Sequence, residues 1–185
     1  REEIKDALAW LAFLANPKDE IAFRRIVNKP ARGIGNTTQD KISEAALSLG
    51  GSIIEACKTY PLKKKAAQGM STFIAAYDSL REMLNTGGAK LSAFVEAMVE
   101  KSALGEYYTV QDEISGTQRV YNLQELTNSA IFYDCSEKGL LDFLDTIELD
   151  RSLEEKSDDD AEKDRVTLIT LHNTKGLEFS RVIIT

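Results

Sequence analysis

Apolar residues recur at intervals of three and four along most of this chain, which is the spacing of one face of an α-helix. The first series ends at Asn16-Pro17, and a short second series precedes Pro30. Glycine pairs at Gly50-Gly51 and Gly87-Gly88 end two later series, because glycine favours helix termination. The side chains of residues 36–38 and Ser52 are expected to cap helices. The pattern therefore predicts helices over 4–14, 20–27, 36–49, 53–58, 62–84, 91–99, 120–132 and 140–147.

The pattern changes near the end of the chain. Residues 166–171 and 181–185 are short, apolar and rich in β-branched side chains, which is typical of buried strands. A polar, glycine-containing loop over 172–179 separates them, and two strands are too few for a stable sheet. We therefore expect a mainly helical region over 1–150, an acidic linker over 151–165, and part of an α/β domain over 166–185.

Composition limits the class of protein. A chain of 185 residues is long enough for one domain, or one domain plus a fragment. No apolar run approaches the roughly 20 residues of a membrane span, and no signal peptide opens the chain. The cysteines, Cys57 and Cys135, are too few for a disulfide framework, so we expect a reducing, cytoplasmic setting. A single histidine, His172, argues against a His-rich metal site, and we expect no metal.

The net charge of −7 argues against a protein that coats nucleic acid through bulk charge. Its distribution modifies that picture. Residues 148–165 hold nine acids and four bases, whereas residues 24–65 hold nine bases and three acids. Asp158-Asp159-Asp160 fits a solvated linker. A metal site there would require a folded loop, because adjacent carboxylates do not converge on one ion.

The first informative motif is the segment 29–38, KPARGIGNTT, which lies between two predicted helices. Gly33 and Gly35 permit a sharp turn while Ile34 between them enters the core. The next helix then presents its free N–H groups and positive dipole end, a geometry that accepts phosphate, and Arg32 would add a charge. This is the arrangement of helix-hairpin-helix loops that hold a DNA backbone. An ordinary tight turn between helices remains the alternative.

The second informative motif is the segment 167–179, TLITLHNTKGLEF. His172 and Lys175 follow the predicted strand at its carboxyl end, where α/β sheets place ligand sites. Lys175 could meet a phosphate, Gly176 permits close backbone approach, and Glu178 could accept a hydrogen bond from a ribose hydroxyl. A lone histidine after a strand is more often structural, but the combination is more specific than its parts.

These segments carry a family resemblance. Residues 170–179 resemble motif V of the UvrD/Rep/PcrA-type superfamily 1 DNA helicases. Residues 1–11, REEIKDALAWL, resemble the stretch that leads from their second motor domain into the inserted 2B subdomain. Residues 32–35, RGIG, resemble that subdomain's duplex-contacting loop, and residues 119–126 resemble its (R)xxNLxEL helix. The four segments follow the family's order and spacing over the whole chain.

The resemblance implies a fold class and a set of site residues. The fold would be a mainly α, multi-helix accessory subdomain with a helix-hairpin-helix-like loop, plus a strand-loop-strand remnant of a RecA-like α/β domain. Duplex DNA would be contacted by Arg32, Gly33, Ile34, Gly35, Thr37 and Thr38. Single-stranded DNA would be contacted by Thr170, His172 and Lys175, and ATP by Gly176 and Glu178. Asn173-Thr174 and Ser180 depart mildly from the family pattern.

The resemblance also implies a parent activity, an ATP-dependent 3′–5′ helicase acting in DNA repair or replication. The expected partners are duplex and single-stranded DNA and repair or replication proteins, with no membrane. ATP and Mg²⁺ would be cofactors of the parent protein. In this sequence no GxxxxGK[ST] segment occurs, and Gly87 to Ser92 resembles one only superficially. We therefore expect this chain alone to be inactive. A protein-interaction or autoinhibitory module is the main alternative, and a relative of recombination nuclease-helicases is a further one.

Overall fold

The described part of the chain is built from helices. The computed structural model describes the backbone of residues 1–157 and the side chains of residues 1–150. Its elements are α1 (Glu2–Ala15), α2 (Glu20–Ile26), α3 (Asn36–Leu47), α4 (Ile53–Thr59), α5 (Lys64–Thr86), α6 (Leu91–Lys101), α7 (Leu104–Ser115), α8 (Arg119–Ser129), the 3-10 turn η1 (Ala130–Phe132) and α9 (Glu137–Ser157). The mainly α class predicted from sequence is confirmed.

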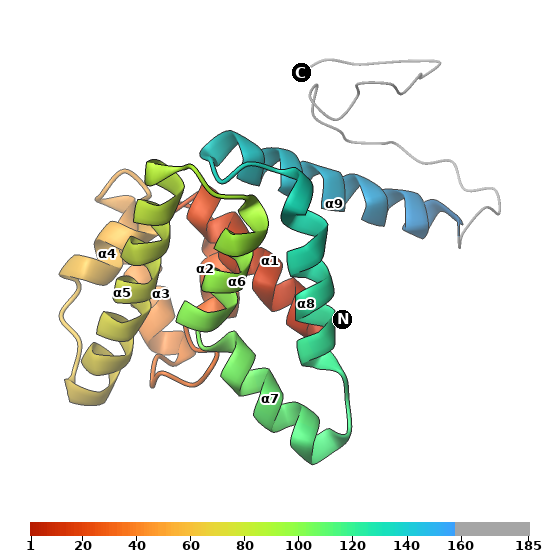
Figure 1. Cartoon of the computed structure of the whole chain (residues 1–185). Coiled ribbons are helices and arrows are strands. Elements are labelled where there is room, and N and C mark those ends of the chain that lie inside the picture. The colour runs from red at the N-terminus through yellow and green to blue at the C-terminus, as the bar shows by residue number, and fades with distance from the viewer. Residues whose placement is uncertain (158–185) are drawn as a thin grey trace. The chain divides into compact units, whose positions relative to one another are not determined.

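The chain divides into two compact units, Arg1–Leu144 and Asp145–Thr185. Within the first unit, α1 lies at the centre, with α3, α4 and α5 on one side and α7 and α8 on the other (Figure 1). In the second unit, the described residues form the last part of α9.

Burial of α1 on nearly all sides explains its central position. Trp10, Phe13 and Leu14 are fully buried, and so is Phe73 of α5. The ring centroids of Trp10 and Phe73 lie 4.9 Å apart, and those of Phe13 and of Phe23 on α2 lie 5.8 Å apart. Each such side chain contributes about 1.5–3 kcal/mol by leaving water. This aromatic cluster therefore holds α1, α2 and α5 together.

Most predicted helices are present, but several ends and one whole helix differ. Helix α3 follows Gly35 directly and has no side-chain cap, so the caps predicted at residues 36–38 are wrong. Ser52 does precede α4, but its side chain makes no capping bond. The sequence pattern does not predict α7, because only Leu104 and Tyr108 of its residues are buried and the apolar signal is weak.

The last helix is longer than the pattern predicts. The helix expected over 140–147 begins at Glu137 and continues to Ser157, into the segment expected to be a linker. That extension is rich in Leu, Glu, Lys and Arg, which favour helices despite their charge. The rest of the predicted linker and the strands predicted over 166–171 and 181–185 lie outside the described residues.

Candidate nucleic-acid interface

The loop between α2 and α3 has one buried and one exposed side. Gly33 adopts a φ of +75°, which side chains rarely tolerate, and Gly35 is the extended residue that precedes α3. Between them Ile34 is fully buried, as predicted. The alternation of glycine and isoleucine therefore anchors the loop in the core and leaves its glycines at the surface.

Side chains on either side of the loop satisfy its buried backbone. The Asn28 Oδ1 accepts from the backbone N–H of Arg32 at 2.7 Å and of Ile34 at 3.1 Å. The buried Gln39 side chain donates from Nε2 to the Ile34 carbonyl at 2.9 Å. Because both partners are in place, the loop has a defined shape before any ligand arrives.

The Arg32 guanidinium is enclosed by protein. Its Nη2 donates to the Ser102 carbonyl at 2.7 Å, and Nη1 donates to the Lys29 carbonyl at 2.9 Å and the Ile26 carbonyl at 3.1 Å. Its Cζ lies 5.8 Å from the centre of the Phe73 ring. Only 9% of Arg32 is exposed. The cation expected to meet a DNA phosphate is therefore occupied inside the protein.

The carbonyls around Arg32 explain why a charge is stable there. Ile26 ends α2, and Ser102 directly follows α6. The carboxyl ends of helices carry negative dipole charge and lack internal partners for their last carbonyls. Burial lowers the pKa of Arg32 to about 10, which still leaves it cationic at neutral pH. Arg32 thus joins two helix ends and fixes the loop that begins beside it.

The exposed side of the loop is mostly backbone. Gly33, Gly35, Asn36 and Thr37 are exposed, and Thr38 is half-buried. Within the described residues, no hydrogen bond is donated by the backbone N–H of Gly35, Asn36 or Thr37. These groups open α3, where the helix dipole is positive. The predicted duplex-contact residues thus fall into a buried set, Arg32 and Ile34, and an outward-facing set, Gly33, Gly35, Thr37 and Thr38.

Helix α5 packs directly against the loop. A Cβ placed on Gly69 would lie 2.1 Å from the Arg32 carbonyl oxygen, so only glycine fits at this crossing. One turn earlier on α5, Cγ of Lys65 lies 3.4 Å from the position that a Cβ on Gly33 would occupy. The first turn of α5 also carries Lys64, next to Lys63, and all three lysines are exposed. Lys65 therefore lies against the loop, and the exposed Lys63 and Lys64 directly precede it in the chain.

A buried acid anchors the start of the loop. Asp6 of α1 is 1% exposed, and its carboxylate pairs with Arg25 Nε at 2.6 Å and Lys29 Nζ at 2.7 Å. It also accepts a hydrogen bond from the hydroxyl of the buried Tyr108. Lys29, which opens the loop motif, additionally pairs with Glu2. We call Asp6, Arg25, Lys29 and Tyr108 the Asp6 cluster.

The pKa directions follow from these contacts. Burial alone would lower the pKa of Lys29, but the hydrogen bonds to Asp6 and Glu2 together have the larger effect, so its pKa is raised. Burial, aided by the bond to Asp6, raises the pKa of Tyr108 well above its ordinary value. The hydrogen bond from Lys29 lowers the pKa of Glu2. At neutral pH the cluster therefore holds charged Lys29 and a neutral phenol.

Two of the segments that carry the family resemblance meet in the structure. The Glu3 carboxylate, on α1, accepts from Asn122 Nδ2 on α8 at 2.7 Å, and Asn122 in turn accepts from Arg1. Arg119 lies 3.7 Å from Glu2. The segments 1–11 and 119–126 thus contact each other through polar side chains, which indicates that these side chains hold α1 and α8 together.

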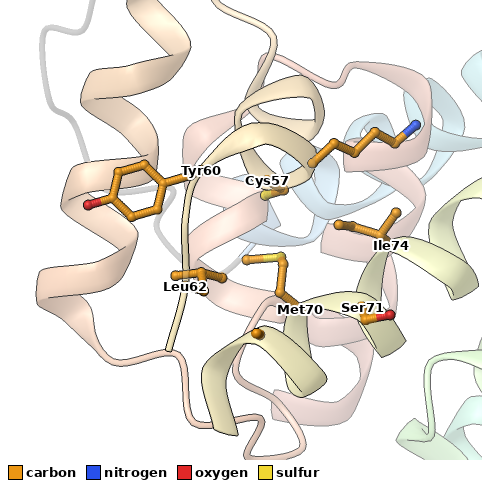
Figure 2. Close-up of a pocket in the computed structure, with 8 residues that line it drawn as sticks. Cys57, Tyr60, Leu62, Met70, Ser71 and Ile74 are labelled. Atoms are coloured by element: carbon orange, nitrogen blue, oxygen red, sulfur yellow. The ribbon is translucent and has the colours of Figure 1, made fainter. Parts of the chain in front are cut away.

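A pocket of about 310 Å³ lies between α4 and the start of α5. Cys57, Leu62 and Met70 converge on it, as Figure 2 shows. Burial raises the pKa of Cys57 to about 12, so its sulfur is a neutral thiol and a poor nucleophile at neutral pH. Both Cys57 and Cys135 are free and buried. The Cys57 thiol therefore gives this pocket no reactive nucleophile at neutral pH.

Neither a metal centre nor a membrane span is found among the described residues. No group of three or more of their His, Cys, Asp or Glu side chains could hold a metal ion. None of their helices combines the length and hydropathy of a membrane span. The residues predicted to contact single-stranded DNA and ATP, Thr170, His172, Lys175, Gly176 and Glu178, lie outside the described part of the chain.

Sequence reasoning missed the residues that shape the loop from a distance. Gly69 interrupts an otherwise good helix pattern, which is a usual sign of close packing. Asp6 is a charged residue inside an apolar helical series, and Gln39 lies beside the core position Ile42. These polar or glycine positions within apolar faces were the available signals.

Comparisons with known proteins identify the family of this chain. A family model described as the UvrD-like helicase C-terminal domain matches residues 1–185. The chain is 34% identical over 192 residues to the ATP-dependent DNA helicase PcrA of Bacillus subtilis (strain 168), covering all of this chain and 26% of that protein. It is 32% identical over 193 residues to DNA helicase II of Escherichia coli (strain K12), with the same two coverages. The chain therefore belongs to the family of the UvrD-like helicase C-terminal domain.

Proposed function

We propose that this chain is the duplex-contacting part of an ATP-dependent 3′–5′ DNA helicase or translocase that acts in DNA repair or replication. The chain spans about a quarter of the length of the relatives it matches. The motor activity is therefore proposed for the whole protein, and the duplex contact for this chain.

The exposed side of the α2–α3 loop carries the proposal. Its free N–H groups at Gly35, Asn36 and Thr37 suit phosphate oxygens, because they need no particular base sequence. The Thr37 hydroxyl, and the half-buried Thr38, add further donors. Arg32 supports this contact indirectly, by holding the loop in shape from its buried side.

The C-terminal motif would link ATP to single-stranded DNA in the whole protein. Thr170, His172 and Lys175 are assigned to the strand, and Gly176 and Glu178 to the nucleotide, from the resemblance of their segment to motif V. ATP and Mg²⁺ would be held mainly elsewhere, because this sequence has no GxxxxGK[ST] segment for the β- and γ-phosphates. We expect the chain alone to hydrolyse no ATP and to unwind no DNA.

A protein-interaction or autoinhibitory module of the same helicase is the second candidate. The observation that favours it is a set of exposed apolar side chains on α7 and α8, namely Val110, Ile114 and Tyr121. A module of this kind would bind no duplex DNA at low salt, so a salt titration with duplex DNA separates the two candidates.

Gly35 offers the sharpest test of the duplex contact. It has an ordinary φ, and no atom lies within 4 Å of the position that a Cβ would occupy, so a side chain fits there without strain. Gly35→Asp places a carboxylate in the proposed phosphate site, at a position where aspartate is a favourable helix cap. We expect duplex affinity to fall by on the order of tenfold while thermal stability is kept or slightly raised.

Gly35→Ala is the matched control, since it adds bulk without charge. We expect it to keep affinity within about threefold of the unchanged chain, a change of less than about 0.7 kcal/mol, because a methyl group does not repel phosphate. Equal affinities for Gly35→Asp, Gly35→Ala and the unchanged chain would contradict the proposed contact. Gly33 and Arg32 are poorer choices, because a side chain at Gly33 is strained and Arg32 is structural.

A further inference from the structure

We propose that Lys63, Lys64 and Lys65 form a second phosphate-contacting surface beside the loop and bind the backbone of the same DNA duplex. The inference rests on the proposed function and assigns it three residues that the recognised loop motif does not contain. They replace the cation that Arg32 was expected to supply.

Packing places Lys65 at the loop, and Lys63 and Lys64 directly precede it in the chain. Lys65 covers Gly33 with its aliphatic stem, since a Cβ on Gly33 would meet Cγ at 3.4 Å and Cδ at 3.7 Å. The backbone nitrogen of Ala66 lies 3.8 Å from the same point. Gly69, one turn further along α5, contacts the Arg32 backbone. The loop therefore lies on the first turns of α5, with the stem of the exposed Lys65 against Gly33.

The charges of the lysine group are not used by the protein. Neighbouring bases of the 24–65 region are neutralised: Arg24 pairs with Asp40 at 2.7 Å, and Lys58 pairs with Asp78 at 2.9 Å. Lys29 is occupied by Asp6. Among the described residues, no acid pairs with Lys63, Lys64 or Lys65. Apart from Lys41 on α3, the exposed bases of this region without an acidic partner in the described part of the chain are therefore Lys63, Lys64 and Lys65.

The lysine group also works against its own helix. Lys63 precedes α5, Lys64 and Lys65 are its first residues, and no acid lies in that first turn. Cations at the amino end of a helix oppose its dipole, and three consecutive ammonium groups repel one another. A polyanion across this surface would relieve both effects. Three adjacent exposed charges without an acidic partner in the described part of the chain thus fit a phosphate backbone better than a structural role.

A duplex backbone is the occupant that the surface favours. The lysine ammonium groups are mobile point charges, and the loop offers backbone N–H groups, so neither part reads a base edge. Together they would offer positive charge and N–H donors to neighbouring phosphates of one strand. Binding should therefore be independent of sequence and steeply dependent on salt.

The test measures duplex affinity against salt for Lys63→Gln, Lys64→Gln and Lys65→Gln combined, in the 185-residue chain. The probe is a blunt DNA duplex of arbitrary sequence. Each lost phosphate contact should reduce the slope of log K against log salt by about 0.9, so the combined variant should lose up to about 2.7. If the two chains bind equally near 1 M salt, this corresponds at about 100 mM salt to a loss of affinity of up to about 500-fold. Thermal unfolding should show an unchanged or higher midpoint.

A control with the same change of charge removes three other exposed lysines, by Lys5→Gln, Lys18→Gln and Lys138→Gln, of which Lys138 pairs with Asp142. We expect it to keep the slope of the unchanged chain within about one contact, because Lys5 belongs to α1, Lys18 to the turn after α1 and Lys138 to α9. An equal loss in both triple variants would overturn the inference in favour of a bulk charge effect.

Two further outcomes separate the inference from the proposed function. If Gly35→Asp weakens binding and the lysine variant does not, the loop contact stands and the lysine surface is wrong. If the unchanged chain binds no duplex at low salt, the proposed function fails and the inference fails with it. A drop for the lysine variant with the control unaffected supports the inference.

Discussion

The Asp6 cluster and the lysine group show two opposite uses of charge in one small unit. Asp6 is almost fully buried and pairs with Arg25 and Lys29, while Tyr108 donates to it. Lys63, Lys64 and Lys65 are exposed and, among the described residues, have no acidic partner. Both sets flank the same loop, one before it in the chain and one beside it in space.

The difference shows which charges maintain the fold and which are free for a ligand. A buried carboxylate without its cations would be costly, so the Asp6 cluster constrains α1, α2 and α7 together. An exposed lysine costs little to keep and is screened by salt. The recognised loop therefore depends on buried charges for its shape and on exposed charges for its partner.

The largest expected effect follows from removing the buried acid. Asp6→Asn keeps the shape of the side chain but leaves Lys29 and Arg25 beside a neutral amide. We expect a loss of about 3–5 kcal/mol in the free energy of unfolding, because one partner of a buried pair is removed. Urea unfolding measures it.

Asp78→Asn is the control for Asp6→Asn. Asp78 pairs with Lys58 at 2.9 Å, but 49% of its side chain is exposed. A loss below about 1 kcal/mol is expected there. If both variants lost the same amount, the distinction between buried and exposed charge would be wrong for this protein.

A second, smaller effect tests the role of Arg32. Arg32→Lys keeps the charge but cannot reach the Ser102 and Lys29 carbonyls together. We expect unfolding free energy to fall by about 2–3 kcal/mol, as for lost charge-assisted bonds. Once folded, the variant should bind duplex DNA within about threefold of the unchanged chain, because the guanidinium does not face solvent.

Arg24→Lys is the matched control, since Arg24 pairs with Glu20 and Asp40 at the surface. The urea midpoint of Arg24→Lys should shift much less than that of Arg32→Lys. An Arg32→Lys variant of normal stability with a reduced salt slope would reverse the assignment and make Arg32 a DNA contact.

The smallest expected effect is a pH dependence of the Asp6 cluster. The pKa values of Lys29 and Tyr108 are both raised in the folded state, so above about pH 10 the unfolded chain releases these protons first. Stability from the cluster is therefore complete at neutral pH and decreases as the pH rises beyond about 10. The decrease would be measured as the urea midpoint of unfolding, recorded at intervals of about one pH unit from about pH 8 to pH 11.

Tyr108→Phe isolates the phenol in that experiment. It removes the hydrogen bond to Asp6 and should cost about 1 kcal/mol at neutral pH. Its stability should then decrease less steeply above about pH 10, because one titrating group is absent. An unchanged alkaline slope would show that Tyr108 is not shielded in the folded state.

Sequence periodicity is sufficient for the helices whose apolar faces are broad. The pattern places both ends of α5 to within two residues, because Met70, Phe73 and Leu80 repeat at regular spacing and Gly87 ends it. Helix α7 escapes prediction because it buries few side chains. Its stability comes from contacts with α6 and α8, which no local pattern records.

The loop is predictable in part for the same reason. Local sequence is enough to place Ile34 in the core between two glycines. It cannot reveal that Arg32 is buried, because the decisive acceptor, the Ser102 carbonyl, lies 70 residues away. It also cannot place Lys65 on Gly33, a contact between segments that are both exposed and polar. Long-range partners decide which basic residues are free.

The most direct measurement is the binding of the unchanged 185-residue chain to a DNA duplex as salt is varied. A surface made of the loop N–H groups and Lys63, Lys64 and Lys65 predicts measurable binding at low salt. It also predicts that the logarithm of the binding constant decreases linearly with the logarithm of the salt concentration, with a slope of about −0.9 for each phosphate contacted. Absence of binding at low salt, or binding that salt does not weaken, would contradict the account.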